Sequence, residues 1–221
     1  MAAVVLLSGG LDSTVTLAKA IDDRHKVTAL SFRYGQRHER ELDSAKKVCG
    51  HYGVDHVIMD VDLSAFRSSL TKKDMKIPQR DHDSIGKDIP DTYVPARNII
   101  FLSAAAGLCE SIDADTIYIG ANAVDYSGYP DCTPEFFGKF RDMIAVGTKA
   151  GAEGHPLKIE TPILRMSKED IVRLGMSLNA PLELTWSCYT GGLKACGVCD
   201  SCRLRLKGFA DAGVKDPIEY D

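Results

Sequence analysis

The residues best suited to chemistry come directly after the first apolar run of the chain. Residues 3–7 are continuously apolar, residues 8–13 read SGGLDS, and residues 14–21 continue as a helix-forming sequence. This pattern predicts a buried strand, a glycine turn and a helix. Because the first N–H groups of a helix have no intrahelical partner, such a helix start binds anions. The two serines add hydroxyl donors, and Asp12 is placed to hold a metal ion beside the anion.

The string SGGxDS after a first strand resembles the PP-loop of ATP pyrophosphatases, which split ATP between its alpha and beta phosphates while adenylating a substrate. No Gly-Lys-Ser/Thr ending follows, which excludes a Walker A loop. The alternative is an ordinary turn with an Asp or Ser helix cap. The resemblance implies that ATP is bound by Leu7, Ser8, Gly9, Gly10, Leu11, Asp12, Ser13 and Thr14, with residues 8–13 at the phosphates and Asp12 toward Mg²⁺.

Length, charge and cysteine content exclude several classes of protein. The 221 residues fit one domain, or one domain with a small appendage. The net charge of −4 argues against a constitutive nucleic-acid binder. No apolar run approaches the ~20 residues that span a bilayer, and the opening run lacks the basic flank of a signal peptide. Seven cysteines without an export signal indicate reduced thiols and a cytoplasmic protein.

Further strands are expected at residues 26–32, 54–60, 115–121 and 156–162, with helices between them. This alternation predicts an α/β fold with a doubly wound, parallel five-stranded sheet covered by helices on both faces. Ligands of such sheets bind at the carboxyl ends of the strands. The end of the second strand therefore lies beside the glycine turn, and the residues expected to contact an adenine there are Phe32, Arg33 and Gln36.

A second group of polar residues opens the helix expected over residues 95–106. Pro95 suits the first position of that helix, which puts Arg97 and Asn98 in its first turn. A lone arginine is most often a surface charge. Two polar groups ahead of an apolar helix instead favour binding of a phosphate or a carboxylate.

The loop after the fourth expected strand, residues 122–132, holds two carboxylates and two tyrosines. An aromatic face with a nearby carboxylate binds a flat, amide-bearing heterocycle, because the carboxylate accepts from ring N–H and amino groups. A glycine-rich turn with Asx caps is the alternative. Together with Asn98, the candidate substrate residues are Asp125, Tyr126, Tyr129 and Asp131.

Two features fit either an active-site or a surface role. Residues 64–92 are polar and contain prolines and a glycine, which is typical of a mobile active-site cover or of a solvated loop. A helix is expected over residues 135–150, and Ser167 and Asp170 fit a capping box for the next one. Lys168 then lies at a helix start, where it reaches a phosphate or faces solvent.

Four cysteines near the end of the chain suit a metal site. Four thiolates at short spacings in a reducing compartment match tetrahedral zinc in a closed, structural site. An iron–sulfur cluster is the competing assignment, although in ferredoxins the fourth cysteine follows downstream. The expected zinc ligands are Cys188, Cys196, Cys199 and Cys202. They belong to a C-terminal helical segment, 181–221, expected to pack on a catalytic domain, 1–180; Cys49, Cys109 and Cys132 are expected to be packed thiols.

Several strings along the chain together resemble one family, the 7-cyano-7-deazaguanine synthases, which are PP-loop enzymes of queuosine and archaeosine precursor biosynthesis. They are residues 7–14, 31–38, 93–98, 120–132, 185–189 and 195–202. The resemblance implies conversion of 7-carboxy-7-deazaguanine, ATP and free ammonia into the 7-cyano product through an activated carboxylate and an amide. It also implies a homodimer. One departure is Thr133, which stands where an arginine is expected.

For that reaction, the expected catalytic residues are Asp12, Arg97 and Lys168. Asp12 would hold Mg²⁺, while Arg97 and Lys168 would neutralise charge at the alpha phosphate and the substrate carboxylate. The nearest alternative is another PP-loop enzyme, such as a tRNA-thiolating enzyme, which needs a redox-active cysteine pair and a nucleic-acid surface. A zinc-stabilised nucleic-acid-binding module without catalysis is the other alternative, and it would bind polynucleotide in a salt-sensitive way.

Overall fold

The computed structural model describes residues 1–80, 84–85, 88–124 and 128–221. The strands are β1 (Ala2–Leu6), β2 (Lys26–Arg33), β3 (Asp55–Asp60), β4 (Thr116–Ile119) and β5 (Lys158–Glu160). The helices are α1 (Leu11–Asp22), α2 (Arg40–Tyr52), α3 (Arg97–Ser111), α4 (Pro134–Gly147), α5 (Lys149–Ala152), α6 (Lys168–Ser177) and α7 (Asp200–Asp211). The short 3-10 helices η2 (Pro130–Cys132) and η3 (Leu182–Leu184) also lie in the described ranges.

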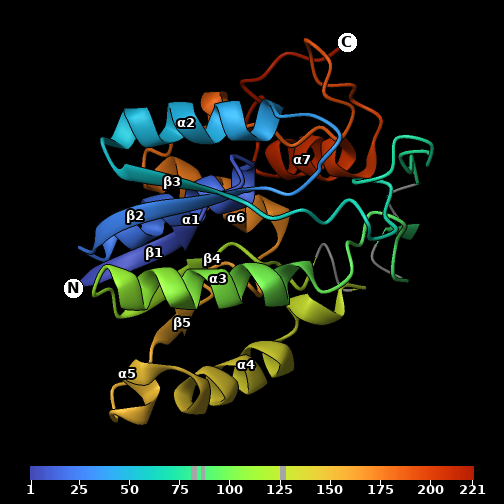
Figure 1. The fold of residues 1–221 in the computed structure, drawn as a ribbon. Helices are drawn as coiled ribbons and strands as arrows, with labels where there is room; N and C mark the ends of the chain where they lie inside the picture. Colours follow the sequence, from blue (N-terminus) through green and yellow to red (C-terminus); the bar gives the residue numbers. More distant parts are fainter. Residues whose placement is uncertain (81–83, 86–87, 125–127) are drawn as a thin grey trace.

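All five strands pair in parallel in the order β3-β2-β1-β4-β5, which confirms the expected fold class. Alternate residues of β1 face opposite layers. Ala3 and Val5 pack with α1 and α2, while Val4 and Leu6 pack with α3 and α4. Figure 1 shows the sheet between α2 on one side and α3 on the other. A central strand buried on both faces explains the continuous apolar run.

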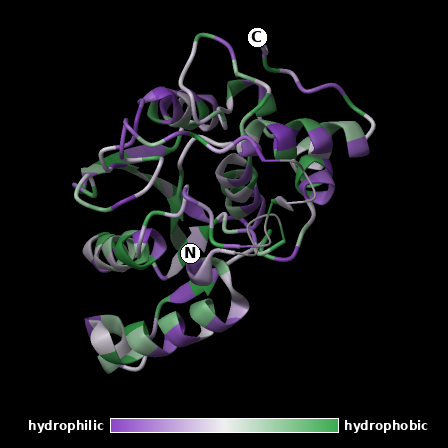
Figure 2. Ribbon diagram, turned by 90° about the vertical axis from the view of Figure 1, so that its right-hand side faces the viewer, coloured by the Kyte–Doolittle hydropathy of each residue, from purple (hydrophilic) through white to green (hydrophobic). Residues whose placement is uncertain are grey.

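The outer layer is amphipathic. Along α4, the long helix at the bottom of Figure 2, hydrophilic and hydrophobic residues alternate. Its buried residues are Phe137, Phe140 and Ile144, which pack into the same core as α3. Within the part of the chain that the structure describes, no helix combines the length and apolar character needed to cross a membrane.

Two helix boundaries differ from the sequence-based expectation. Pro95 does not take the first position of α3, because Ala96 precedes the helix in the left-handed region with φ of 56° and the helix begins at Arg97. The helix expected over 135–150 is two helices. Thr148 has extended backbone and its hydroxyl accepts from the N–H of Gly151 at 3.1 Å, so it ends α4 and caps α5.

The C-terminal residues pack against the strand–turn–helix at the start of the chain. Leu182 and Phe209 join Leu11 and Val15 in one apolar cluster with α6. The N–H of Trp186 donates to the carbonyl of Gly9 at 2.9 Å. The division into domains 1–180 and 181–221 stays a prediction, and these contacts support the packing that it assumes.

The described residues of the 64–92 segment contain no strand, and they lie beside α7 (Figure 1). The Arg37 guanidinium donates to carbonyls of this segment, at 3.1 Å to Ser69 and 2.9 Å to Met75. Arg80 pairs with Asp200 of α7 at 2.8 Å. The segment is thereby tied to the connection between β2 and α2 and to α7, and its role as an active-site cover stays a prediction.

Candidate active site

The site lies where the sheet order reverses. The chain leaves β1 toward β2 on one side, while β4 pairs with β1 on the other side. In open α/β sheets, a crevice for ligands forms at this switch point, beyond the carboxyl ends of the strands. Here it brings the SGGLDS turn next to the loop that follows β4. Gly120 allows this, because a Cβ there would lie 3.0 Å from the Asp12 carbonyl oxygen.

The turn after β1 presents donors toward the crevice. Gly10 precedes α1 with extended backbone, so the helix begins at Leu11. The first N–H groups of α1 have no carbonyl partner inside the helix and carry the positive end of its dipole. The Ser8 and Ser13 hydroxyls lie 3.0 Å apart, and the N–H of Ser8 donates to Ser13 Oγ at 3.2 Å. This arrangement suits a phosphate group.

Gly9 fixes the position of this turn. Its φ is 90°, in the region that side chains rarely adopt, and a Cβ would lie 2.1 Å from the Glu41 carbonyl oxygen and 2.6 Å from the Ala45 nitrogen. The turn therefore contacts the backbone of α2 directly, which only glycine allows.

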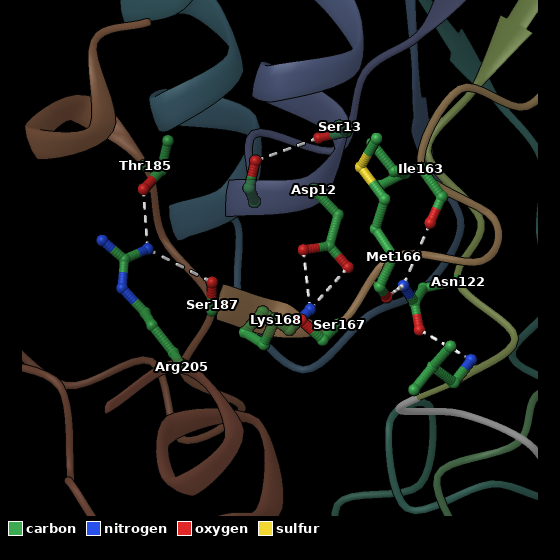
Figure 3. Close-up of polar contacts among 12 residues, drawn as sticks. Asp12, Ser13, Asn122, Ile163, Met166, Ser167, Lys168, Thr185, Ser187 and Arg205 are labelled. Atoms are coloured by element: carbon green, nitrogen blue, oxygen red, sulfur yellow. Dashed lines mark hydrogen bonds and ion pairs between the residues drawn. The ribbon is translucent and has the colours of Figure 1, made fainter. Parts of the chain in front are cut away.

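Asp12, in the first turn of α1, and Lys168 form a paired carboxylate and ammonium. Lys168 Nζ lies 2.7 and 2.8 Å from the two Asp12 carboxylate oxygens (Figure 3). The Ser167–Asp170 capping box predicted from the sequence is present, and it starts α6 so that Lys168 points inward. Lys168 is only 8% exposed, so it faces the site and not open solvent. The pair brings one positive and one negative group beside the SGGLDS turn, called the phosphate turn below.

A cavity of about 250 Å³ joins this pair to the interior of the protein. Most of the residues predicted for the site line it. They are Leu7, Ser8, Gly10, Leu11, Asp12, Ser13, Phe32, Gln36, Arg97, Asn98, Tyr129 and Lys168. Phe32 stacks on Phe101 with the ring centroids 3.9 Å apart, which gives the cavity a flat apolar wall.

Other predicted residues lie outside the cavity lining. Gly9 and Thr14 face the protein interior behind the turn. Arg33 is exposed and pairs with Asp60 at 2.6 Å, because the last residue of β2 points away from the crevice. Asp131 is buried outside the cavity lining, where its carboxylate accepts a hydrogen bond from the Asn98 N–H at 3.1 Å. Asp125 and Tyr126 fall outside the described residues, so their roles stay predictions.

Arg97 adds a positive charge to the lining of the cavity. It lies with Tyr34 and Tyr129, whose hydroxyl hydrogen-bonds with that of Thr92 at 2.7 Å. Burial opposes the Arg97 charge, but the neighbouring Tyr34, Tyr129 and Asp131 raise the pKa of the guanidinium. Burial also raises the pKa of Tyr34 to about 12, so this hydroxyl stays protonated. Arg97 is thus a permanent cation facing the cavity, suited to a carboxylate.

The Asn98 side chain makes hydrogen bonds within the protein. Its Nδ2 donates to the Asp131 carbonyl at 3.0 Å and to the Cys132 sulfur at 3.3 Å. These bonds attach α3 to the loop after β4 and so place Arg97. Burial raises the pKa of Cys132 to about 12, as expected for a packed thiol.

Sequence reasoning missed several residues that line the cavity. Asn122 donates to the carbonyls of Ile163 and Met166 at 3.1 and 2.7 Å (Figure 3), which holds the loop after β4 against the chain leading to α6. Glu41 of α2 and Arg205 of α7 also line it. Neither stands out in the sequence, because both come from helices rich in charged residues.

The four cysteines that were predicted as zinc ligands lie together in the structure. The sulfur atoms of Cys188, Cys196, Cys199 and Cys202 all lie within 4.8 Å of one another. Zinc–sulfur bonds of about 2.3 Å in a tetrahedron separate sulfurs by about 3.8 Å, so a small contraction would complete the site. The N–H groups of Cys196 and Thr190 point at Cys188 Sγ, at 3.3 and 3.4 Å, as partners of a thiolate do. The donor set therefore fits a structural zinc ion.

Comparison with known proteins agrees with this geometry. A family model described as "Queuosine biosynthesis protein QueC" matches residues 2–213. The chain belongs to this family. Curated relatives named 7-cyano-7-deazaguanine synthase match along the whole chain. The Acetivibrio thermocellus protein is 55% identical, covering 99% of this chain and 97% of its own, and the Thermoplasma acidophilum protein is 53% identical, covering 99% and 92%.

Solved structures show that the queuosine biosynthesis family shares its fold with more distant proteins. A 4-thiouridine synthetase, solved in complex with RNA and ATP, has a TM-score of 0.51 and 18% identity, covering 99% of this chain and 47% of that chain. At this identity the likeness concerns the fold alone.

Gly208 offers a test of how α7 places the lysine. A Cβ at Gly208 would lie 2.3 Å from Lys168 Cγ and 2.9 Å from its Cβ, so α7 packs directly on the lysine stem. We expect Gly208→Ala to move the ammonium away from Asp12 and to lower kcat by about ten- to a hundredfold, as small misplacements at a reaction centre do. Gly138→Ala on α4, where the methyl group meets nothing within 4 Å, is the control. Equal turnover of both variants would contradict the assignment.

Arg205, which lines the cavity, forms a buried ion pair with Asp216. The guanidinium donates to the two carboxylate oxygens at 2.7 and 2.9 Å, and to the Thr185 hydroxyl at 2.6 Å. Removing one partner leaves an uncompensated charge, so we expect Asp216→Ala to lower the free energy of unfolding by about 3–5 kcal/mol. Thermal melting should show it as a fall of about 10 °C. Asp211→Ala, which breaks an exposed pair with Lys207, should cost less than about 1 kcal/mol.

Proposed function

We propose that the chain converts 7-carboxy-7-deazaguanine, ATP and ammonia into 7-cyano-7-deazaguanine, a step of queuosine precursor biosynthesis. The observation that carries the proposal is that the phosphate-binding turn and the Arg97 cation line one and the same cavity. An ATP alpha phosphate at the turn and a substrate carboxylate near Arg97 would then meet inside the cavity. The names of relatives at 50–55% identity support the same reaction.

The chemistry requires activation of the acid. A carboxylate resists ammonia because oxide would have to leave. Transfer of AMP to one carboxylate oxygen supplies a good leaving group, and ammonia then gives the amide. A second activation, at the amide oxygen, allows that oxygen to leave and the nitrile to form. The protein contributes position and charge stabilisation, as in other phosphate transfers.

Individual residues take roles within this scheme. The N–H groups of the turn and the serine hydroxyls would hold the phosphates, and Lys168 would neutralise charge as the alpha phosphate is attacked. Arg97 would hold the substrate acid. A magnesium ion on Asp12 would supply further charge neutralisation at the phosphates. The flat wall formed by Phe32 and Phe101 suits the face of a ring.

The test is mass spectrometry of the product. Metal-loaded protein is mixed with ATP, ammonium and 7-carboxy-7-deazaguanine, and we expect the 7-cyano compound only when all three are present. The released nucleotide, AMP or ADP, is read from the same samples. Protein that neither binds nor consumes ATP while its metal is intact would overturn the proposal. Light scattering tests the homodimer expected from the family resemblance.

A further inference from the structure

One acidic side chain of the cavity has no task in activating the substrate acid. Glu41 stands in the first turn of α2 and lines the cavity together with Arg97. Across the described ranges of the chain, its carboxyl group makes no hydrogen bond or ion pair. A carboxyl group that faces a ligand cavity without a protein partner is available to the ligand.

The backbone fixes where this carboxyl group lies. The close contact between Gly9 and the Glu41 carbonyl ties the first turn of α2 to the phosphate turn. Arg97 approaches from α3 on the other side, and its charge acts on Glu41. An acid group that is held by Arg97 and activated at the phosphate turn therefore has its reacting carbon in the part of the cavity that Glu41 faces.

The proposed reaction needs a proton acceptor at that place. When ammonia adds to the activated acid, the new C–N bond carries an extra proton on nitrogen, and this proton leaves as AMP departs and the amide forms. In the second stage, the C–O bond breaks, the oxygen departs on the nucleotide, and both amide protons leave as the triple bond forms. Asp12 and Arg205 are unsuited to these transfers, because each is already bound in an ion pair.

We propose that the Glu41 carboxylate accepts these protons from nitrogen, first from the ammonia adduct and then from the activated amide. The assignment rests on the proposed function. Burial raises the pKa of Glu41 to about 7, against the opposing effect of Arg97. A carboxyl group with that pKa both accepts and releases protons near neutrality, as a general base should.

The test separates the nitrogen steps from the step that precedes them. Glu41→Gln keeps the size of the side chain and removes its basicity. We expect this variant to exchange labelled pyrophosphate into ATP at the rate of the unaltered chain when 7-carboxy-7-deazaguanine is present and ammonium is absent. Formation of amide and nitrile should fall by about a hundredfold or more in kcat. The KM for 7-carboxy-7-deazaguanine should stay the same.

Glu39→Gln is the matched control, because Glu39 lies just before α2, exposed and paired with Arg33. It should leave every step unchanged. Should Glu41→Gln fail to fold, Glu41→Asp replaces it, and the shorter carboxyl group should slow only the nitrogen steps. Thermal melting of each variant checks the fold.

Two results would overturn the assignment. Unchanged nitrile formation by Glu41→Gln would show that no proton passes through this residue. A raised KM for the acid, with pyrophosphate exchange lowered in parallel, would show that Glu41 binds the heterocycle. Absence of both exchange and nitrile formation in the unaltered chain is a different result, since it would remove the proposed function itself. Nitrile formation without exchange would instead remove only the transfer of AMP, and product formation by Glu41→Gln would still test the proton acceptor.

Discussion

Asp12→Asn is expected to lower nitrile formation by about a hundred- to a thousandfold, the cost of removing one charged or donor group that acts on the transition state. The amide keeps the shape of the side chain but loses the charge that binds Lys168 through both oxygens, at 2.7 and 2.8 Å. The ammonium then has no fixed position at the mouth of the cavity. Steady-state rates with saturating ATP and ammonium measure the effect.

The defect should be confined to the reaction. Asp12 has a side chain that is 20% exposed, and it lies in the first turn of α1, so its replacement leaves no buried cavity. Melting temperature and zinc content should stay the same. Asp22→Asn, at the exposed end of the same helix, is the control and should keep full activity. Full activity of Asp12→Asn would remove the phosphate turn from the mechanism.

A double-mutant cycle with Lys168→Met sharpens this result. Because the two side chains act as one ion pair, the loss in the double variant should be close to that of either single variant and far from their product. Multiplicative losses would show that the two side chains contribute independently and that their ion pair has no part in placing the lysine for the reaction.

The sheet and the phosphate turn could be predicted from the sequence because local signals decide them. A continuous apolar run of strand length that ends at a glycine turn, such as residues 3–7, favours a strand that is covered on both faces, and β1 is one. Glycine at position 9 is required by its φ of 90°. The four metal ligands could also be predicted, because the cysteines lie close together in the sequence. Their sulfur atoms come together in the structure.

Residues brought in by packing could not be predicted in this way. Glu41 belongs to a helix whose other carboxylates, Glu39 beside it and Asp43 within it, are exposed, and only the contact with Gly9 selects which one faces the cavity. Arg205 follows Arg203 in a basic stretch, but α7 turns Arg205 toward Asp216 and buries it. Arg33 was expected near the adenine because it ends β2, yet its side chain points away toward Asp60. These outcomes depend on the register of one element against another.

Replacing a zinc ligand is expected to have the largest effect on stability. A structural zinc site contributes on the order of 10 kcal/mol to folding, which is comparable with the whole stability of a typical domain. The residues around the cysteines include the glycine-rich stretch 190–197 and form a small apolar cluster with Trp186 and Tyr220. We therefore expect Cys199→Ala to lose its zinc and to unfold the residues from about 185 onward. Metal analysis and thermal melting measure both effects.

Loss of the metal should also stop the reaction, although no cysteine of the cluster lines the cavity. The C-terminal residues hold two parts of the site in position. The backbone N–H of Trp186 donates to the Gly9 carbonyl at 2.9 Å, and Gly208 packs on the stem of Lys168. Cys49→Ala, at a buried thiol of α2 that is not part of the cluster, is the control and should keep its zinc. Bound iron with visible absorbance would instead favour the iron–sulfur alternative. Unchanged melting of metal-free protein would show that the four thiols hold no structural ion.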